Sequence, residues 1–199
     1  MAEERHLYII SGPNGAGKTT ASMTVLPRIL QCREFVNADE IARGLSPFNP
    51  GSVAIEAGRL MSHRIDELLA QGESFAIETT LAARSYNRLV ERAHRQHYDV
   101  TLLYFWLHSP QLAAERVAER VNKGGHDIPH DTIERRYYSG ICNFFQVYAP
   151  IVDYWTLVDN SEVPRTIVAK GGKGMETIIL DKEKYEIISS LCRKEITEN

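Results

Sequence analysis

A glycine-rich segment near the start of the chain carries the clearest chemical pattern in the sequence. Residues 12–19 read Gly-Pro-Asn-Gly-Ala-Gly-Lys-Thr and match Gly-x-x-x-x-Gly-Lys-Ser/Thr, the pattern of a phosphate-binding loop. Its glycines let backbone N–H groups converge on phosphate oxygens, Lys18 reaches the outer phosphates, and Thr19 offers magnesium a hydroxyl ligand. The pattern predicts a nucleotide site made of Gly12, Pro13, Asn14, Gly15, Ala16, Gly17, Lys18, Thr19 and Thr20.

Carboxylates follow the second and third apolar segments, where the ends of parallel strands would line a crevice. Asp39 comes soon after residues 34–36 and could take a proton from an attacking hydroxyl group, so it is the candidate general base. Alternatively, Asp39 caps a short helix that begins beside it. Glu78 and Thr80 suit a polyhydroxyl ligand or magnesium-bound water, or they form an ordinary turn. We expect Arg84 to complete the acceptor pocket.

Arginines gather in a segment that we expect to form a lid, at about residues 115–137. Arg116 and Arg120 lie four apart on one helical face, where like charges repel unless an anion lies between them. Arg136 lies at the edge of the apolar stripe of the next predicted helix, so it is the better placed of two neighbouring arginines to reach a cleft. Phosphoryl transfer needs such cations. The alternative is a solvated face on which acidic neighbours surround the arginines.

Three further polar segments carry weaker signals. Residues 123–130 read Lys-Gly-Gly-His-Asp-Ile-Pro-His, and this pattern favours a mobile polar loop over a metal site because it lacks regular ligand spacing. Asn160 follows the last apolar segment and could touch an adenine ring or belong to a plain turn. Residues 171–174 are glycine-rich but lack the Lys-Ser/Thr pair, so they predict only a turn.

Strands and helices alternate along the chain. Five apolar segments predict buried strands at residues 7–10, 34–36, 75–77, 100–107 and 155–158. One helix is predicted to begin near Gly17, and a short helix beside Asp39 is the alternative to its catalytic role. Another is predicted after Ser52, with an apolar face of Ala57, Met61, Ile65 and Leu68, and ends at Gly72; a further one follows Ser85. The last two run from Ser109 to Gly124-Gly125, and from Asp131, with Glu134 in capping-box spacing, to just before Pro150. This alternation predicts a three-layer α/β/α fold around a mostly parallel five-stranded sheet.

The part of the chain after Asn160 changes character. Residues 166–170 and 176–180 predict a hairpin, and residues 182–192 predict a last helix. We expect a small C-terminal appendage over about 161–199 within one domain that spans 1–199, because no linker interrupts the sequence.

Composition limits the classes of protein to consider. The 199 residues are 43% hydrophobic and 25% charged, which fits one globular domain. A net charge of −3 gives no sign of a basic groove, so nucleic acid is not expected as a partner. Three widely spaced cysteines predict reduced thiols. Neither a signal peptide nor an apolar run long enough to cross a membrane is recognisable, and a cytoplasmic location is expected.

The motifs together resemble those of the zeta toxin family, over about residues 5–160. The resemblance rests on residues 11–20, on Phe-Val-Asn-Ala-Asp at 35–39, on Ile-Glu-Thr-Thr at 77–80, and on the segment from Arg120 through Gly-Gly-His-Asp-Ile-Pro to Arg136. The glycine-rich motif is specific on its own, and the others count through their order and spacing. The short Gly-Gly-His-Asp-Ile-Pro lid is similar to that of the short family members.

This resemblance implies a P-loop kinase fold and ATP-dependent phosphorylation of a hydroxyl on a UDP-activated amino sugar, typically UDP-N-acetylglucosamine. Asp39 would be the base, Glu78 and Thr80 the sugar-binding pair, and Lys18 the phosphate lysine. Arg120 and Arg136 are the candidates for two lid arginines on the γ-phosphate, with ATP and Mg²⁺ as cofactors. Members of the family pair with an antitoxin that blocks the nucleotide site, so an antitoxin protein is an expected class of partner.

Other functions share the phosphate loop. A nucleotide kinase or an enzyme similar to chloramphenicol phosphotransferase would differ in the acceptor pocket. A polynucleotide 5′-hydroxyl kinase would need a basic groove, for which arginines at 84, 88, 92 and 95 are candidates. A non-kinase ATPase is disfavoured, because the sequence has no Leu-Ser-Gly-Gly-Gln signature.

Overall fold

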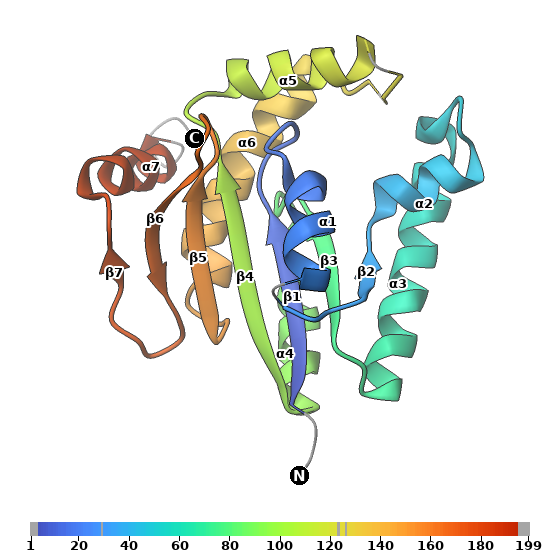
Figure 1. The fold of residues 1–199 in the computed structure, drawn as a ribbon, viewed down its shortest axis with the longest axis horizontal. Helices are drawn as coiled ribbons and strands as arrows, with labels where there is room; N and C mark the ends of the chain where they lie inside the picture. The colour runs from blue at the N-terminus through green and yellow to red at the C-terminus, as the bar shows by residue number, and fades with distance from the viewer. Residues whose placement is uncertain (1–3, 29, 123, 126, 195–199) are drawn as a thin grey trace.

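The computed structural model describes residues 4–28, 30–122, 124–125 and 127–194 (Figure 1). Its strands are β1 (Arg5–Ser11), β2 (Glu34–Val36), β3 (Phe75–Thr79), β4 (Tyr98–Trp106), β5 (Tyr154–Asp159), β6 (Thr166–Gly171) and β7 (Ile178–Ile179). Its helices are α1 (Lys18–Arg28), α2 (Ala38–Leu45), α3 (Ala54–Gln71), α4 (Asn87–Arg95), α5 (Pro110–Asn122), α6 (His130–Asn143) and α7 (Lys182–Lys194). A 3₁₀ turn, η1 (Pro50–Val53), precedes α3, and a π-helical turn, η2 (Phe144–Tyr148), follows α6.

One sheet of seven strands has the order β2-β3-β1-β4-β5-β6-β7. The first five strands are parallel, as the apolar segments predicted. The expected number of five is wrong because the C-terminal hairpin extends the same sheet, with β6 antiparallel to β5 and β7 antiparallel to β6. The chain reverses after β5, and the N–H and C=O groups along the edge of β5 are thereby paired with those of β6.

The carboxyl ends of the parallel strands bring the predicted motifs together. Ser11 at the end of β1 lies in register with Thr79 of β3 and with Tyr104 of β4, and Val36 at the end of β2 lies in register with Ile77. The glycine-rich loop, Asp39 and Glu78 therefore leave the sheet at the same edge, which is where open α/β sheets bind ligands.

Helices cover both faces of the sheet. Figure 1 shows α1 in front of the sheet, α4 and α6 behind it, and α5 crossing above the carboxyl ends of the strands. Beside β2, α3 packs against α2 and buries Ala57, Met61, Ile65 and Leu68, the face that its helical periodicity predicted. At the opposite edge, α7 packs on β6 and α6.

The boundaries of α5 follow the sequence signals. The hydroxyl oxygen of Ser109 accepts a hydrogen bond from the backbone N–H of Leu112 at 3.1 Å, which makes it the predicted N-cap. At the other end, Gly124 has φ +86° and donates its N–H to the carbonyl of Val121. A left-handed residue is what a helix C-terminus favours, and glycine adopts it at little cost.

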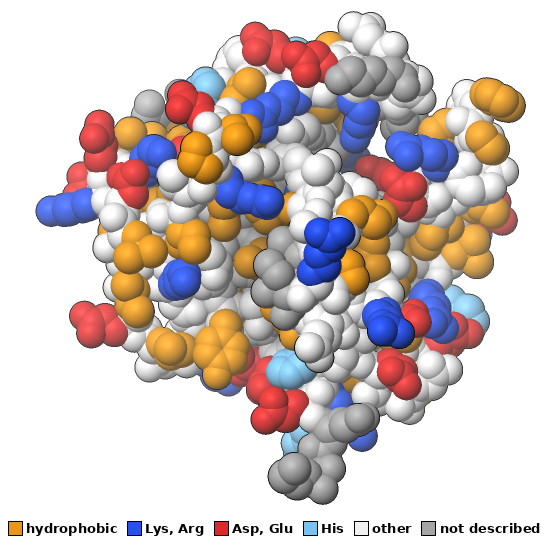
Figure 2. Space-filling view, in the orientation of Figure 1, with side chains coloured by type: hydrophobic (Ala, Val, Ile, Leu, Met, Phe, Trp, Pro, Cys, Tyr) orange, Lys and Arg blue, Asp and Glu red, His pale blue; other side chains and the backbone are white. Residues whose placement is uncertain are grey.

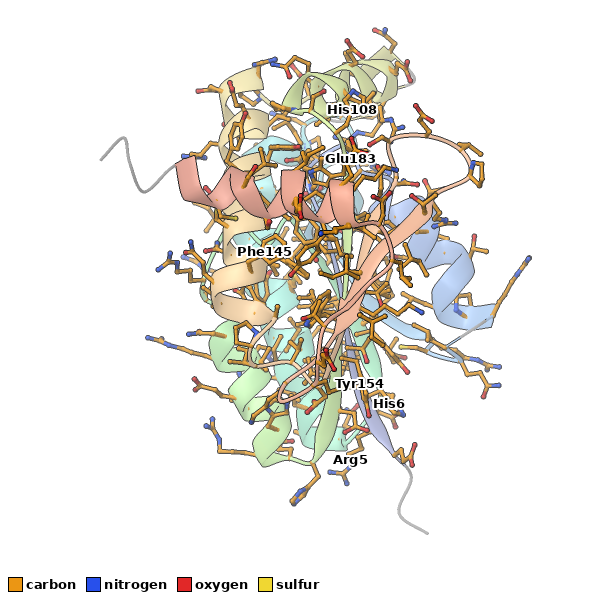
Figure 3. The ribbon with its side chains drawn as sticks, turned by 90° about the vertical axis from the view of Figure 1, so that its left-hand side faces the viewer. Arg5, His6, His108, Phe145, Tyr154 and Glu183 are labelled. Carbon is orange, nitrogen blue, oxygen red and sulfur yellow. The ribbon has the colours of Figure 1, made fainter. Side chains whose placement is uncertain are left out.

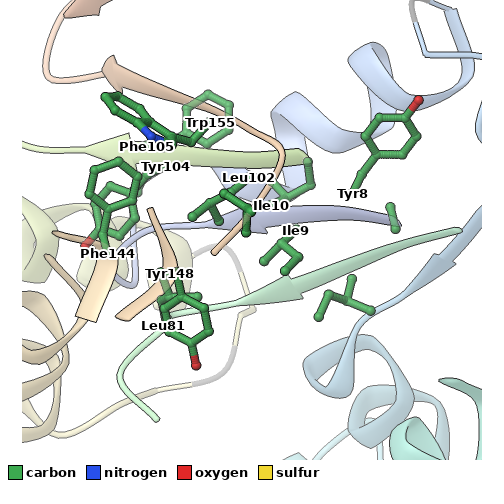
Figure 4. Close-up of a cluster of buried hydrophobic side chains, with 14 of the residues drawn as sticks. Tyr8, Ile9, Ile10, Leu81, Leu102, Tyr104, Phe105, Phe144, Tyr148 and Trp155 are labelled. Atoms are coloured by element: carbon green, nitrogen blue, oxygen red, sulfur yellow. The ribbon is translucent and has the colours of Figure 1, made fainter. Parts of the chain in front are cut away.

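The start and end of α6 differ from the prediction. The helix begins at His130 after Pro129 rather than at Asp131, and the carboxylate of Asp131 accepts the N–H of Thr132 instead of forming a capping box. Its continuation, η2, is π-helical rather than α-helical. Aromatic packing accompanies the change, because Phe144 contacts Tyr104 and Trp155 with ring centroids 5.1 and 5.4 Å apart (Figure 4).

No helix within the described part of the chain is long and apolar enough to cross a membrane.

Candidate functional site

The glycine-rich loop has backbone conformations that require glycine at three positions, Gly12, Gly15 and Gly17. Gly12 has φ +137°, and a Cβ there would lie 2.2 Å from the backbone oxygen of Phe105. Gly17 has φ +74°, and a Cβ there would lie 2.8 Å from the side-chain nitrogen of Asn160. The loop therefore lies against β4 at Gly12 and against the residue after β5 at Gly17, with no room for a Cβ at either position, as a close turn around phosphates needs.

Lys18, the first residue of α1, is buried inside this loop. Its ammonium group donates to the carbonyl of Pro13 at 2.9 Å and lies 3.9 Å from Oε1 of Glu78. Burial lowers the pKa of Lys18; the carboxylates of Glu78 and Asp39 oppose this shift, and Arg120 and Arg136 add to it. Because the pKa is lowered overall, the pairing with carboxylates does not compensate the lost hydration of the ammonium group, and an anion would do so.

Glu78 contacts the C-terminal end of the same loop. The hydroxyl of Thr19 donates to both carboxylate oxygens of Glu78, at 3.0 and 2.9 Å, and the Glu78 side chain is only 8% exposed. Burial raises the pKa of Glu78, although Lys18 and Thr19 lower it in part. Burial thus disfavours the charged forms of both Lys18 and Glu78, and bound ions of opposite charge would stabilise them.

A cavity of about 630 Å³ opens beside this pair. Its walls come from the glycine-rich loop, from α2, from the region around η1, and from α5 with the residues that follow it. Figure 2 shows basic and acidic side chains on both sides of the space between α5 and α2. The lining residues are Asn14, Gly15, Gly17, Lys18, Thr19, Thr20, Ala38, Asp39, Glu40, Ala42, Arg43, Pro50, Gly51, Ala54, Glu78, Arg116, Glu119, Arg120, Gly124 and Gly125.

Asp39 lines this cavity from the first turn of α2 and is exposed to it. The sequence left open whether Asp39 caps this helix. In the structure the cap is Asn37, whose side-chain oxygen accepts the backbone N–H of Asp39 at 2.8 Å. The Asp39 carboxylate is therefore not used in capping and faces the space next to Lys18 and Glu78.

The predicted arginines approach the loop from two helices. Arg116 and Arg120 of α5 line the cavity, and the guanidinium of Arg116 donates to the carbonyls of Asn160 at 2.8 Å and Ser161 at 2.7 Å. Arg136 of α6 donates to the side-chain oxygen of Asn14 at 3.4 Å, whereas its neighbour Arg135 is exposed. The predicted positions 123 and 126 of the lid lie outside the described residues.

Asn160 contacts the glycine-rich loop directly. Its side-chain nitrogen donates to the carbonyl of Ala16 at 2.8 Å, and its own N–H donates to the carbonyl of Trp106. The contact that the structure shows for Asn160 is to the loop itself, and its expected contact with an adenine ring stays a prediction.

Thr80 and Arg84 are not among the described residues that line the cavity. The chain turns sharply after β3, where Leu81 has φ +61° and its N–H bonds to the Thr79 hydroxyl. Beyond this turn, Nε of Arg84 donates to the side-chain oxygen of Asn143 at 3.1 Å. An acceptor role for Thr80 and Arg84 therefore stays a prediction, and the structure adds no contact that supports it.

Several cavity residues on α2 and around η1 were not predicted from the sequence. Arg43 pairs with Glu40 at 3.2 Å, and Pro50, Gly51 and Ala54 form the wall next to them. The spacing of Glu40 and Arg43 predicts a helical ion pair, but their position at the cavity follows only from the docking of α2 on α3.

The described residues contain no group of three His, Cys, Asp or Glu side chains that could hold a metal ion by themselves. A hydroxyl and a carboxylate do lie together, at Thr19 and Glu78, beside the predicted phosphate position. Oxygen ligands of this kind suit Mg²⁺, which usually takes the rest of its shell from water and phosphate. The residues present therefore fit a phosphate-bound magnesium ion.

Comparison with known proteins places the chain in a family. A family described as AAA domain matches residues 7–137, more than half of the chain. An uncharacterized protein of Haemophilus influenzae is 29% identical over 126 residues, which cover 63% of this chain and 88% of that protein.

Solved structures share the fold. AvrRxo1-ORF1 in its complex with -ORF2 and ATP matches with a TM-score of 0.78 and 18% identity over 94% of this chain, which spans 64% of the length of that protein. The PezAT toxin–antitoxin system of Streptococcus pneumoniae matches with a TM-score of 0.64 and 15% identity, over 100% of this chain and 89% of that one. A gluconokinase from Sinorhizobium meliloti matches with a TM-score of 0.52 and 17% identity, over 79% and 83%. The chain therefore has an α/β fold of the P-loop kinase kind.

Proposed function

Because this chain belongs to the AAA domain family, we propose that it is an ATP-dependent kinase that phosphorylates a hydroxyl group of a small molecule. The observation that carries this proposal is the burial of Lys18 and Glu78 against one cavity, with burial disfavouring the charged form of each. A polyphosphate would stabilise the charged form of Lys18, and its magnesium ion would stabilise the charged form of Glu78, because each carries the opposite charge.

The nucleotide half of the proposal rests on the glycine-rich loop. Backbone N–H groups at the start of α1 would bind phosphate oxygens, and Lys18, which now donates to the carbonyl of Pro13, would donate to the outer phosphates instead. Thr19 and Glu78 would hold magnesium and its water, and the ion would supply neutralisation of phosphate charge. The gluconokinase likeness and the ATP in the AvrRxo1-ORF1 complex support this half.

The acceptor half rests on Asp39. A carboxylate near Lys18 can take the proton from an acceptor hydroxyl as its oxygen attacks the γ-phosphorus. The bond from that phosphorus to the bridging oxygen then breaks, and ADP leaves. Arg120, which lines the cavity, and Arg136, which contacts Asn14, are assigned to the charge on the migrating group.

The finer proposal is a UDP-activated amino sugar such as UDP-N-acetylglucosamine. The cavity wall on the α2 side holds charged side chains and small residues, among them Glu40, Arg43 and Gly51. Such a wall suits a polar acceptor that carries both hydroxyl groups and negative charge. A polynucleotide acceptor is less well supported, because Arg92 is paired with Asp66 at 2.6 Å and Arg84 is bonded to Asn143.

The test is transfer of labelled phosphate from ATP into a panel of UDP-sugars, nucleotides and oligonucleotides. We expect label in a UDP-amino sugar and none in oligonucleotides. Label in another small molecule would identify that molecule as the acceptor and would leave the kinase proposal standing. Phosphate released only to water would reject the kinase in favour of an ATPase.

A protein partner of the antitoxin kind is also proposed, since AvrRxo1-ORF1 was solved in a complex with -ORF2 and PezAT is described as a toxin–antitoxin system. A partner that covers the cavity would compete with ATP, so nucleotide affinity measured with and without a candidate partner tests the proposal. We also propose a cytoplasmic location, because ATP is at hand there.

Magnesium binding by Glu78 gives a pH-dependent prediction. The pKa of Glu78 is raised above its ordinary 4.5, so the carboxylate takes up a proton at a higher pH than an exposed glutamate does. Magnesium-dependent ATP affinity should therefore fall as the pH drops through this raised pKa, and Glu78→Gln should show weak magnesium dependence at every pH.

Calorimetric titration with ATP at several magnesium concentrations measures this effect, and Glu91→Gln on an exposed turn of α4 is the control. A Glu78→Gln variant with unchanged magnesium dependence and a raised acceptor KM would assign Glu78 to the acceptor instead, as the zeta toxin resemblance implies.

A further inference from the structure

The C-terminal helix reaches the loop that supports the nucleotide site. The ammonium group of Lys184, on the first turn of α7, lies 2.7 Å from Oδ2 of Asp159, the last residue of β5. Figure 3 labels Glu183, the neighbour of Lys184 on α7, and His108, which follows β4, in the same region of the molecule. Lys184 lies outside residues 7–137, which match the AAA domain family.

Asp159 connects Lys184 to the loop of residues 160–161 through hydrogen bonds. The Asp159 side chain is only 9% exposed, and its Oδ1 accepts hydrogen bonds from the backbone N–H and the hydroxyl of Ser161 at 2.9 and 2.5 Å. The Ser161 hydroxyl in turn accepts the backbone N–H of His108 at 2.8 Å. The Lys184 bond thus fixes the carboxylate around which the loop after β5 turns.

Residues 160–161 hold two parts of the nucleotide site. Asn160 donates to the carbonyl of Ala16 in the glycine-rich loop, and the carbonyls of Asn160 and Ser161 accept both hydrogen bonds of the Arg116 guanidinium. A displacement of this loop would therefore move the glycine-rich loop and Arg116 together.

The charges of the pair support a fixed contact. Burial alone would raise the pKa of Asp159, but hydrogen bonds from Lys184 and Ser161 outweigh it and lower that pKa overall. The pKa of Lys184 is raised, chiefly by its hydrogen bond to Asp159. A charge-assisted hydrogen bond of this length holds its partners more tightly than a neutral one.

From these contacts we infer that Lys184 is a positioning residue for ATP binding, acting through Asp159 and the 160–161 loop on the glycine-rich loop and Arg116. The inference rests on the proposed nucleotide site and adds a role for the C-terminal helix in it. Lys184 touches neither the cavity nor the expected phosphates, so its effect belongs to ATP affinity and not to the acceptor.

Calorimetric titration of the full chain with ATP and magnesium tests the inference. For Lys184→Met we expect the ATP dissociation constant to rise roughly fivefold or more, the lower end of typical couplings between sites. Lys184→Arg keeps the charge and should bind ATP almost as the wild type does. Lys182→Met is the matched control, because Lys182 is exposed on the same turn and pairs only loosely with Glu186 at 3.9 Å. The acceptor KM should stay constant throughout.

Asp159→Asn tests the same link from the other side and covers the case in which Lys184→Met fails to fold. It keeps an oxygen for Ser161 and removes the charge that holds Lys184, so it should weaken ATP binding, and the double variant should be no weaker than the worse single variant. Thermal melting of each variant identifies the folded proteins.

Wild-type affinity in folded Lys184→Met, or equal losses in Lys182→Met, would overturn the role of Lys184 and leave the kinase proposal intact. A wild-type chain that binds no ATP would overturn both.

Discussion

Asp39→Asn should leave ATP binding unchanged and lower the rate of phosphoryl transfer by about 10²- to 10⁴-fold, the usual contribution of a general base. The amide has nearly the same shape as the carboxylate but cannot take the proton of the acceptor hydroxyl. Because the backbone N–H of Asp39 and the cap at Asn37 are untouched, α2 should remain in place.

The measurement for Asp39 combines turnover with the acceptor from the panel and calorimetric ATP affinity. Asp131→Asn is a matched control, since Asp131 is an exposed aspartate in the first turn of α6. Unchanged turnover in Asp39→Asn would remove this residue from the mechanism. A loss of ATP affinity equal to the loss of rate would make it a nucleotide-binding residue instead.

Lys18→Ala should abolish transfer to every acceptor, with a loss in kcat of about 10³-fold or more, since removing one preorganised donor to developing charge costs about 10²- to 10³-fold. The ammonium group of Lys18 is the buried cation of the loop, and water that enters the space left by its side chain cannot supply a fixed positive charge. All acceptors should be affected alike because Lys18 acts on the phosphates they share.

Turnover with two unrelated acceptors checks the Lys18 prediction, and thermal melting establishes that the variant is folded. Lys170→Ala, which removes an exposed lysine of β6, is the control. A variant that loses transfer to one acceptor and keeps it for another would show that Lys18 binds acceptor rather than nucleotide.

The local motifs were predicted well because their chemistry depends on neighbouring residues. The order of Gly12, Gly17, Lys18 and Thr19 fixes a turn into a helix N-terminus, and the structure has that turn. The position of Asp39 followed from the rule that parallel strands end at one edge. The N-cap of α2 is Asn37, two residues before the candidate Asp39, and helix propensities alone do not fix a helix start to within two residues.

Contacts between distant segments were not predictable in the same way. The sequence gives no sign that Thr19 bonds Glu78 across 59 positions or that Arg136 reaches Asn14 across 122. Strand β6 joins the main sheet because the edge of β5 offers unpaired backbone N–H and C=O groups. The sequence pattern of a hairpin does not say which sheet edge it will pair with.

By itself the sequence determined the phosphate loop, the alternation of strands and helices, and the carboxylates at strand ends, since each depends on periodicity or on a few adjacent residues. Only the tertiary structure decided which charges share the buried space beside Lys18, how α2 and α5 enclose the cavity, and that α7 reaches Asp159. Burial and distance between remote residues set these features, and both arise only when the whole sheet and its helices are packed together.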